Sequence, residues 1–308
     1  MRVLVTGAGG YIGSACAHSL AETVEVIGLG HGTNFPVLRK KGRPEIRWVE
    51  GEVEDIVSLV RPFGKIDAIV HVAFRSPTAV SADAVQHNIR SLRALIEFCI
   101  AVQVTKVVSI STYAVYAQSE APLTESSPVA ASTEYARQKL EAEAVLRTSG
   151  LPFVILRLTH VYGRGLGVGD EGGVLVRWIG QAVRGEEIEV VDGEVVERDY
   201  VHLRDVVSAI SACLHASPPV GGFYNIGSGS SQTLARVARL IADIVGAKTG
   251  RPVKIRERES PCPKPWRRRI SIQRAAEELG YVPQVKFADG VREMARAYRT
   301  TTTEACPL

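Results

Sequence analysis

The chain lacks a long apolar run, and it lacks a strong excess of charge of either sign. A membrane-spanning helix needs about 20 consecutive apolar residues. The 37 Lys and Arg residues against 33 Asp and Glu give a net charge of only +4 over 308 residues. These features favour a globular cytoplasmic protein with neither a membrane nor a nucleic acid as partner. The first apolar run starts at Val3, so we expect no leader segment.

Cysteine is also scarce. The five cysteines are odd in number and show no paired spacing of the kind that zinc sites or disulfide frameworks use. We therefore expect reduced thiols and no metal site. Hydrophobic residues make up 45% of the chain, enough for a full core in one large domain or in one domain with a smaller lobe. The cysteines are Cys16, Cys99, Cys213, Cys262 and Cys306.

The N-terminal segment combines an apolar run with closely spaced glycines. Residues 1–6 have the pattern of a strand, and Gly7, Gly10 and Gly13 follow at the start of a helical pattern. Such a turn lets backbone N–H groups and a helix N-terminus approach a pyrophosphate, because no Cβ atoms stand in the way. An ordinary tight turn is the alternative, but the order of strand, turn and helix favours a dinucleotide site.

Short β-branched runs alternate with helical patterns along the first two thirds of the chain. This alternation predicts an α/β fold with a Rossmann-like, doubly wound parallel sheet. After Gly163, a glycine-rich loop, a helix ending at Arg184 and short strands near 188–191 and 223–226 predict a smaller C-terminal substrate-binding lobe. The predicted strands of the sheet are 3–5, 24–27, 68–72, 106–110 and 153–158. We place the cofactor domain at 1–162 with 195–227, and the substrate lobe at 163–194 with 228–308.

A second motif carries the chemistry. Tyr135 and Lys139 are four residues apart, so they share one face of a helix. A free phenol titrates near pH ~10, and a neighbouring ammonium favours its ionised form. An exposed helix with a lysine lying along its surface is the alternative for an isolated pair.

In order along the chain, these motifs resemble those of the extended short-chain dehydrogenases/reductases, and within them the NAD(P)-dependent nucleotide-sugar epimerase/dehydratase group. The resemblance covers nearly the whole chain. Its motifs here are Thr6–Gly13, Gly51–Asp55, Val70–Ala73, Asn88, Ser109–Tyr116, Tyr135–Lys139, Leu156–Gly163, Arg198–His202 with Asp205, and Tyr224–Gly227.

The resemblance implies a role for each catalytic residue. Tyr135 acts as acid or base at a carbinol, Lys139 holds the nicotinamide ribose and lowers the pKa of Tyr135, and Thr112 hydrogen-bonds the reacting oxygen. It also implies the cofactor-binding residues, which are Gly7, Gly10, Tyr11, Ile12, Gly30, His31, Glu52, Val53, Val72, Ala73, Asn88, Tyr135 and Lys139.

Two departures from the family pattern narrow the chemistry. Dehydratases of the family carry an Asp-Glu pair after the threonine, and this chain has Tyr113 and Ala114 instead. Eliminating water needs an acid and a base, so we disfavour a dehydratase. At the end of the second strand, Gly30 stands where NAD-using relatives usually carry an acidic residue. We expect NAD as the cofactor, with NADP as the alternative if His31, Arg39 or Lys40 contacts a 2′-phosphate.

The substrate side is predicted from Thr112, His160 and two arginines. Arg198 matches the family position that contacts a nucleotide diphosphate, and guanidinium groups pair well with phosphate oxygens. Arg268, within the cluster Trp266–Arg269, is a candidate for a second contact. Salt bridges are the alternative for both arginines, and a buried structural role is the alternative for His160. The glycine-rich loop 163–169 either folds over the substrate or is a plain connection.

We therefore predict a nucleotide-sugar 4-epimerase that removes and returns a hydride at C4. The alternative is an NADPH-dependent 4-ketoreductase, which the catalytic residues alone do not separate from an epimerase. A cofactor-sensing protein without catalysis is less favoured, because it would not need Thr112, Tyr135 and Lys139. The family resemblance also implies a homodimer through helices at 88–102 and 135–147, although packing on the sheet explains their apolar positions equally.

Overall fold

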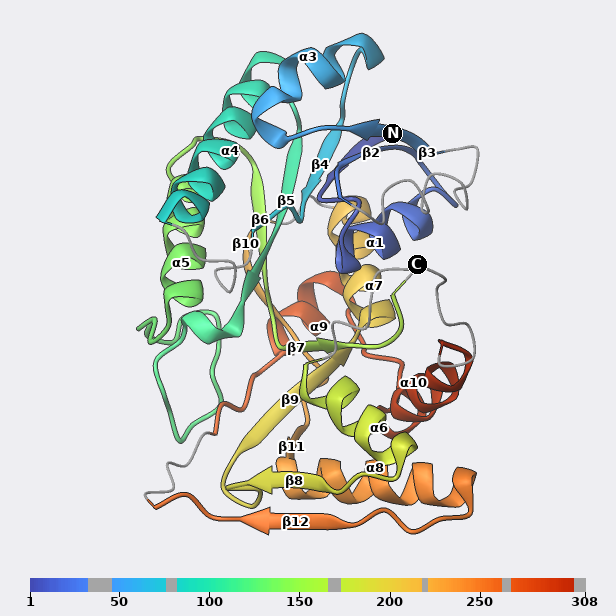
Figure 1. Cartoon of the computed structure of the whole chain (residues 1–308). Helices are drawn as coiled ribbons and strands as arrows, with labels where there is room; N and C mark the ends of the chain where they lie inside the picture. Colours follow the sequence, from blue (N-terminus) through green and yellow to red (C-terminus); the bar gives the residue numbers. More distant parts are fainter. Residues whose placement is uncertain (33–45, 76–81, 166–172, 218–220, 262–266, 302–308) are drawn as a thin grey trace.

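A seven-stranded parallel sheet forms the centre of the larger part of the molecule (Figure 1). The computed structural model describes residues 1–32, 46–75, 82–165, 173–217, 221–261 and 267–301. The strand order is β10-β6-β5-β4-β1-β2-β3, and all neighbours are parallel. The strands are β1 (Arg2–Thr6), β2 (Glu25–Gly30), β3 (Ile46–Glu50), β4 (Ala68–His71), β5 (Lys106–Thr112), β6 (Phe153–Leu158) and β10 (Gly222–Ile226).

Helices cover both faces of this sheet because alternate strand residues point to opposite sides. Val3 and Val5 join the core that includes α1 and α7, whereas Leu4 between them joins the core that includes α4 and α5. Figure 1 shows these two helix pairs on opposite sides of the sheet. The helices of this part are α1 (Tyr11–Leu20), α3 (Ile56–Val60), α4 (Ala82–Ala101), α5 (Glu134–Arg147), α7 (Leu203–His215) and α9 (Gln273–Leu279).

The strand order reverses between β1 and β4. The chain proceeds from β1 outward to β3, then returns to β4 on the other side of β1 and continues outward to β10. In an open α/β sheet, such a reversal leaves a crevice at the carboxyl ends of the strands, where ligands bind. The predicted α/β, Rossmann-like fold is confirmed.

Two small sheets and three helices form the lower part of the molecule in Figure 1. One sheet has the order β11-β9-β7 and the other pairs β12 with β8. A separate apolar core, which includes Trp178, Ile241 and Val291, joins their helices. The elements are β7 (His160–Tyr162), β8 (Ile188–Val191), β9 (Glu197–His202), β11 (Ser231–Thr233), β12 (Ile255–Arg258), α6 (Val174–Arg184), α8 (Leu234–Thr249) and α10 (Phe287–Thr301).

Strands β10 and β9 show how the predicted division into domains compares with the sheets. The strand predicted near 223–226 lies in the large sheet as β10, paired with β6, rather than in the smaller lobe. Strand β9 falls in the range 195–227, which we grouped with the cofactor domain, but it pairs with β7 and β11. The exact domain boundaries stay a prediction.

The sequence also predicted reduced thiols and no membrane-spanning helix. Cys16, Cys99 and Cys213 are free and buried, and burial raises the pKa of each thiol to about 12. Cys262 and Cys306 lie outside the described residues. In the part of the chain that the structure describes, no helix has the length and apolar character of a membrane span.

Candidate active site

A cavity of about 660 Å³ lies where β1, β2 and β4 end. It occupies the crevice that the reversal of strand order creates, and Tyr135 and Lys139 stand on its wall. Every residue that we predicted to bind the cofactor lines this cavity, namely Gly7, Gly10, Tyr11, Ile12, Gly30, His31, Glu52, Val53, Val72, Ala73, Asn88, Tyr135 and Lys139.

The glycine turn is closely packed in a way that requires glycine. Gly7 has φ +68°, and a Cβ atom there would lie 2.7 Å from the backbone nitrogen of Ala73. A Cβ atom on Gly13 would lie 2.1 Å from the Gly7 carbonyl oxygen. Because both positions lack a Cβ atom, the start of α1 can pack against the ends of β1 and β4, which is the geometry that a bound pyrophosphate needs.

One end of the cavity carries a carboxylate with several basic neighbours. Gly30 ends β2 without a side chain, but Glu52 lines the same wall. One Glu52 carboxylate oxygen lies 3.3 Å from His31 Nε2 and 2.6 Å from an Arg75 guanidinium nitrogen, and the other lies 3.6 Å from His87 Nε2. The acidic group missing from the end of β2 is therefore present nearby, on the segment that follows β3.

Asn88 fixes the segment after β4. Its Oδ1 accepts a hydrogen bond of 2.8 Å from the Arg75 backbone N–H. Its Nδ2 donates to the Arg75 carbonyl at 3.0 Å and to Gln138 Oε1 at 3.2 Å. Asn88 therefore joins the rim of the cavity to both α4 and α5, whereas its predicted role is direct contact with the cofactor.

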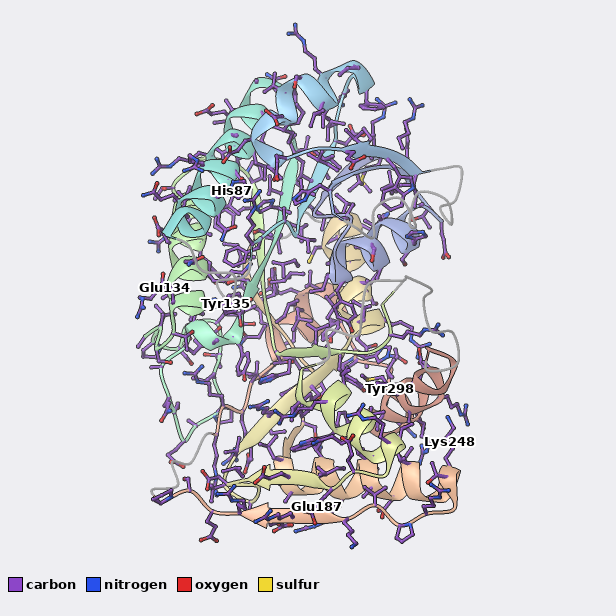
Figure 2. All side chains as sticks on the ribbon, in the orientation of Figure 1. His87, Glu134, Tyr135, Glu187, Lys248 and Tyr298 are labelled. Atoms are coloured by element: carbon purple, nitrogen blue, oxygen red, sulfur yellow. The ribbon has the colours of Figure 1, made fainter. Side chains whose placement is uncertain are left out.

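The three predicted catalytic residues lie together. Thr112 ends β5, and its side chain hydrogen-bonds Tyr135 near the start of α5. Lys139 is 7% exposed, and its Nζ donates to the Ile110 carbonyl at 2.9 Å. The same Nζ lies 5.9 Å from the centre of the Tyr135 ring and 3.8 Å from the centre of the Phe74 ring. Figure 2 shows Tyr135 at the lower end of α5, with His87 further up on α4.

Burial controls the titration of this set. It lowers the pKa of Lys139 to about 7, while Glu143 one turn further along α5 acts in the opposite direction. It also lowers the pKa of His71 to about 3, together with the charge of Lys139. We expected Lys139 to lower the pKa of Tyr135. Instead, burial raises the pKa of Tyr135, and the opposing influence is the hydrogen bond with Thr112.

Tyr113 and Ala114, which follow Thr112, contact two residues that we predicted to bind the substrate, His160 and Arg268. The Tyr113 hydroxyl is 3.1 Å from His160 Nδ1. Arg268 is buried, and it donates to the Ala114 carbonyl at 3.2 Å. Burial, assisted by the charge of Arg198, lowers the pKa of His160 to about 3. His160 is therefore a neutral imidazole at physiological pH.

Arg198 lies on the wall of a different cavity, of about 340 Å³, in the smaller lobe. Arg177, Trp178 and Glu189 also line that cavity, so it has two guanidinium groups and one carboxylate. The structure thus places Arg198 close enough to influence His160 but outside the lining of the 660 Å³ cavity.

Some predicted features lie outside the described residues. These are the basic residues Arg39, Lys40, Lys41 and Arg43, together with Trp266 and positions 166–169 of the glycine-rich loop. Arg267, next to Trp266, forms an ion pair of 3.6 Å with Glu197. Across the described ranges, no group of three or more His, Cys, Asp or Glu residues is arranged to hold a metal ion.

Some residues of the site were not predicted as site residues. Phe74, Arg75 and His87 line the 660 Å³ cavity, and Tyr113 contacts His160. The signal for Phe74 and Arg75 was their position directly after β4, because residues that follow a strand of an α/β sheet face the crevice. Tyr113 was considered only as a replacement for an acidic residue, and His87 carried no recognisable motif.

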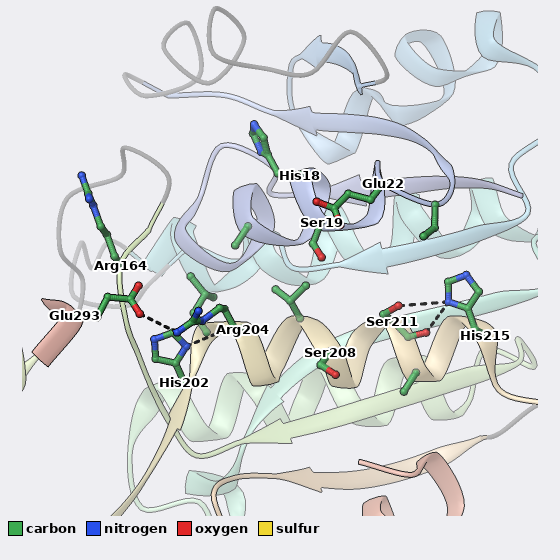
Figure 3. A pocket seen from close by; sticks show the side chains of 15 residues that line it. His18, Ser19, Glu22, Arg164, His202, Arg204, Ser208, Ser211, His215 and Glu293 are labelled. Atoms are coloured by element: carbon green, nitrogen blue, oxygen red, sulfur yellow. Dashed lines mark hydrogen bonds and ion pairs between the residues drawn. The ribbon is translucent and has the colours of Figure 1, made fainter. Parts of the chain in front are cut away.

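A larger cavity lies elsewhere. It measures about 1050 Å³ and runs between α1 and α7. Figure 3 shows His18 and Ser19 of α1, with Glu22 just beyond this helix, on one side of it, and Ser208, Ser211 and His215 of α7 on the other side, with Arg204 bonded to Glu293 at one end. It contains none of the predicted site residues.

The fold and the glycine turn are typical of a Rossmann-like protein that binds a dinucleotide. The model of the NAD dependent epimerase/dehydratase family matches residues 3–227, and the chain belongs to that family. It is an NAD-dependent enzyme of the nucleotide-sugar epimerase/dehydratase group.

Known relatives extend over the whole chain. The UDP-glucose 4-epimerase of Corynebacterium glutamicum is 27% identical, covering 92% of this chain and 91% of its own length. The dTDP-glucose 4,6-dehydratase of an Actinoplanes species is 26% identical, covering 97% and 98%. The UDP-glucuronic acid 4-epimerase of Bacillus cereus, solved with UDP-glucuronic acid and NAD, superimposes with a TM-score of 0.83 at 22% identity over 98% of this chain and 100% of its own. Because epimerase and dehydratase match equally well, overall identity does not distinguish the reactions.

Proposed function

We propose that the chain is a nucleotide-sugar 4-epimerase that uses NAD. The observation that carries this proposal is that Tyr135 and Lys139 line the cofactor cavity and that Thr112 lies beside Tyr135, without a carboxylate pair after Thr112. The set suits removal and return of a hydride at a carbinol. Tyr113 and Ala114 offer no acid and base for eliminating water, which argues against the dehydratase activity of some relatives.

The residues divide the chemistry among them. Tyr135 takes the proton of the C4 hydroxyl as the hydride leaves C4, and it returns that proton when the hydride is delivered to the other face of the ketone. Thr112 hydrogen-bonds the same oxygen, and Lys139 holds the ribose of the nicotinamide. A bound nicotinamide supplies the acceptor and donor of the hydride. The close backbone approach at Gly7 and Gly13 fits its pyrophosphate.

Substrate binding follows from the cationic groups of the lobe. We place a nucleotide diphosphate against Arg198, because guanidinium groups bind phosphate oxygens in bidentate geometry. Arg268 and His160 flank Tyr113 between that arginine and the catalytic set. We assign them to the sugar side of the substrate. The B. cereus relative solved with UDP-glucuronic acid supports a nucleoside diphosphate sugar as the class of ligand.

Glu52 supports NAD over NADP. A carboxylate at this end of the cavity accepts hydrogen bonds from ribose hydroxyls and repels a 2′-phosphate. We expect NADH to bind at least about tenfold more tightly than NADPH, equivalent to about 1.4 kcal/mol, and Glu52→Gln to narrow that ratio. Fluorescence titration of NADH and NADPH measures both dissociation constants.

The matched control is Glu54→Gln. Glu54 pairs with His87 and Arg90 and is absent from the cavity lining, so its replacement should leave the ratio unchanged. Tighter binding of NADPH than of NADH by the wild-type chain would support the NADP-dependent ketoreductase, the alternative that Gly30 favours.

We also propose a cytoplasmic homodimer through α4 and α5. The exposed faces of these helices carry mainly charged side chains, so pairing of two copies there would depend on complementary charges rather than on an apolar patch. The exposed charged residues among the described positions of the two helices are Arg90, Arg93, Glu97, Glu134, Arg137, Glu141 and Arg147.

The activity is tested directly with purified protein and no added cofactor. We expect interconversion of UDP-glucose with UDP-galactose, or of their N-acetyl forms, resolved by chromatography. No conversion, with oxidation of NADPH when a nucleotide 4-keto-6-deoxy sugar is supplied, would identify the ketoreductase. No turnover in either assay, with cofactor bound, would leave the cofactor-sensing protein.

A further inference from the structure

A buried ion pair lies next to the catalytic set, outside the lining of the cofactor cavity. Glu143 of α5 accepts hydrogen bonds of 3.1 and 2.7 Å from Nε and a terminal nitrogen of Arg157 on β6. Each side chain is 6% exposed. Burying two charges is costly even when they pair, and two apolar side chains could often replace them. A specific reason for retaining this pair must come from what it touches.

Glu143 joins α5 to the end of β5. Besides Arg157, it accepts a hydrogen bond of 2.5 Å from the Ser111 hydroxyl. Ser111 directly precedes Thr112, and Glu143 follows Lys139 by one helical turn. Lys139 itself donates to the carbonyl of Ile110, the residue before Ser111. Lys139 and Glu143, one turn apart on α5, therefore hold Ile110 and Ser111, two successive residues of β5.

Arg157 extends these contacts to two aromatic rings and a buried amide. Its guanidinium lies 4.8 Å from the centre of the Tyr116 ring and 4.5 Å from that of Phe223. The Tyr116 hydroxyl donates to Asn225 Oδ1 at 2.7 Å, and Asn225 Nδ2 donates to the Ser271 carbonyl at 3.2 Å. The ion pair is thus fixed on its far side by a buried polar network.

We propose that Glu143 is a positioning residue: it fixes Thr112 relative to Tyr135 and Lys139, and it keeps a negative charge one turn from the Lys139 ammonium. This inference rests on the proposed function, because it assigns Glu143 to the catalytic set. A carboxylate at this distance favours the protonated lysine against the desolvation that opposes it. The titratable groups facing Lys139 are Tyr135 and Glu143 on α5 and His71 on β4, with Arg157 on β6 beyond Glu143.

The test replaces the charge and keeps the shape. Glu143→Gln retains an oxygen for Ser111 but removes the carboxylate. We expect the titration midpoint of Lys139 to fall by about one pH unit, measured from its side-chain ¹⁵Nζ resonance in lysine-labelled protein. The resonance is assigned by its loss in Lys139→Met. In the epimerase assay, kcat should fall about tenfold with little change in the KM of the nucleotide sugar, and its decline toward high pH should begin earlier.

Glu141→Gln is the matched control. Glu141 lies on the exposed side of the same helix, so the same substitution there should move neither the midpoint nor the pH profile. An unchanged Lys139 midpoint in Glu143→Gln would overturn the inference even if the protein became less stable, because a purely structural role would change stability alone. A shifted midpoint without turnover of any nucleotide sugar would support the inference about Glu143 and contradict the proposed function.

A second variant tests the proposal in case Glu143→Gln does not fold. Glu143→Gln leaves Arg157 with a buried charge and no carboxylate partner, which destabilises the fold. The double substitution Glu143→Gln with Arg157→Met removes both charges and leaves an apolar side chain between Tyr116 and Phe223. We expect this variant to fold and to show the lowered Lys139 midpoint. A folded double variant with the wild-type midpoint would also overturn the inference.

Discussion

Tyr135→Phe should reduce kcat by about 10²- to 10⁴-fold, the range that a lost acid-base group typically costs. The substitution removes one oxygen atom and keeps the ring that packs edge-on against Phe74. The cavity walls are otherwise unchanged, so the dissociation constant of NADH should stay within about twofold of wild type. Steady-state assay with the active nucleotide sugar and fluorescence titration of NADH measure the two quantities.

Tyr298→Phe provides a control with the same chemical change. Tyr298 belongs to α10 in the smaller lobe, where its hydroxyl contacts Arg184, and Figure 2 shows it far from Tyr135. Its turnover should equal that of wild type. Normal turnover of Tyr135→Phe would remove Tyr135 from the mechanism, whereas loss of both turnover and NADH binding would indicate a disturbed cavity instead.

Lys139→Met should abolish most turnover and at the same time stabilise the cofactor-free protein. Burial lowers the pKa of Lys139 from 10.5 to about 7, which means that the folded state pays a desolvation cost for the ammonium. Methionine has a similar length and no charge. We expect the free energy of unfolding to rise by about 1–3 kcal/mol at pH 6 to 7, measured by urea denaturation.

The pH dependence of this gain has a defined sign. Between pH 7 and pH 10.5 the unfolded lysine holds a proton that the folded one has lost. Wild-type stability therefore rises with pH across that window, relative to the variant. The advantage of Lys139→Met should be full below about pH 7 and vanish near pH 10.5. Lys248→Met, which also removes a lysine that donates to a backbone carbonyl, is the matched control for the loss of that hydrogen bond. A constant difference at all pH values would contradict the assigned cost.

The sequence predicts the sheet and the cofactor cavity well because both depend on local patterns. The run that contains Val3 and Val5, followed by Gly7 and Gly13, specifies a strand, a turn and a helix through short-range geometry alone. The parallel pairing then brings the ends of β1, β2 and β4 together, so residues predicted separately line one cavity. Strand β3 was not predicted, because its half-buried pattern at the edge of the sheet lacks the continuous apolar run of the central strands.

What the sequence did not predict depends on contacts between distant segments. Glu52 is in a motif, but its pairing with Arg75 and His87 depends on how three segments meet at the rim of the cavity. The pKa of Tyr135 was misjudged because helical spacing indicates which neighbours are near but not how much water remains. The ion pair of Glu143 with Arg157 joins a helix to a strand, and neither residue shows its burial in the local pattern.

A hydrogen bond between Tyr11 and Gly163, which no sequence motif predicted, connects the cofactor cavity with the end of β7. Tyr11 lines the cofactor cavity, and its hydroxyl donates at 2.8 Å to the carbonyl of Gly163, just after β7. Strand β7 also contains His160, which we propose to lie on the substrate side. With that assignment, the peptide unit of Gly163 belongs to the surroundings of both ligands. Coupling free energies are reciprocal, so if cofactor binding changes the affinity for the substrate through this bond, substrate binding changes the affinity for the cofactor by the same factor.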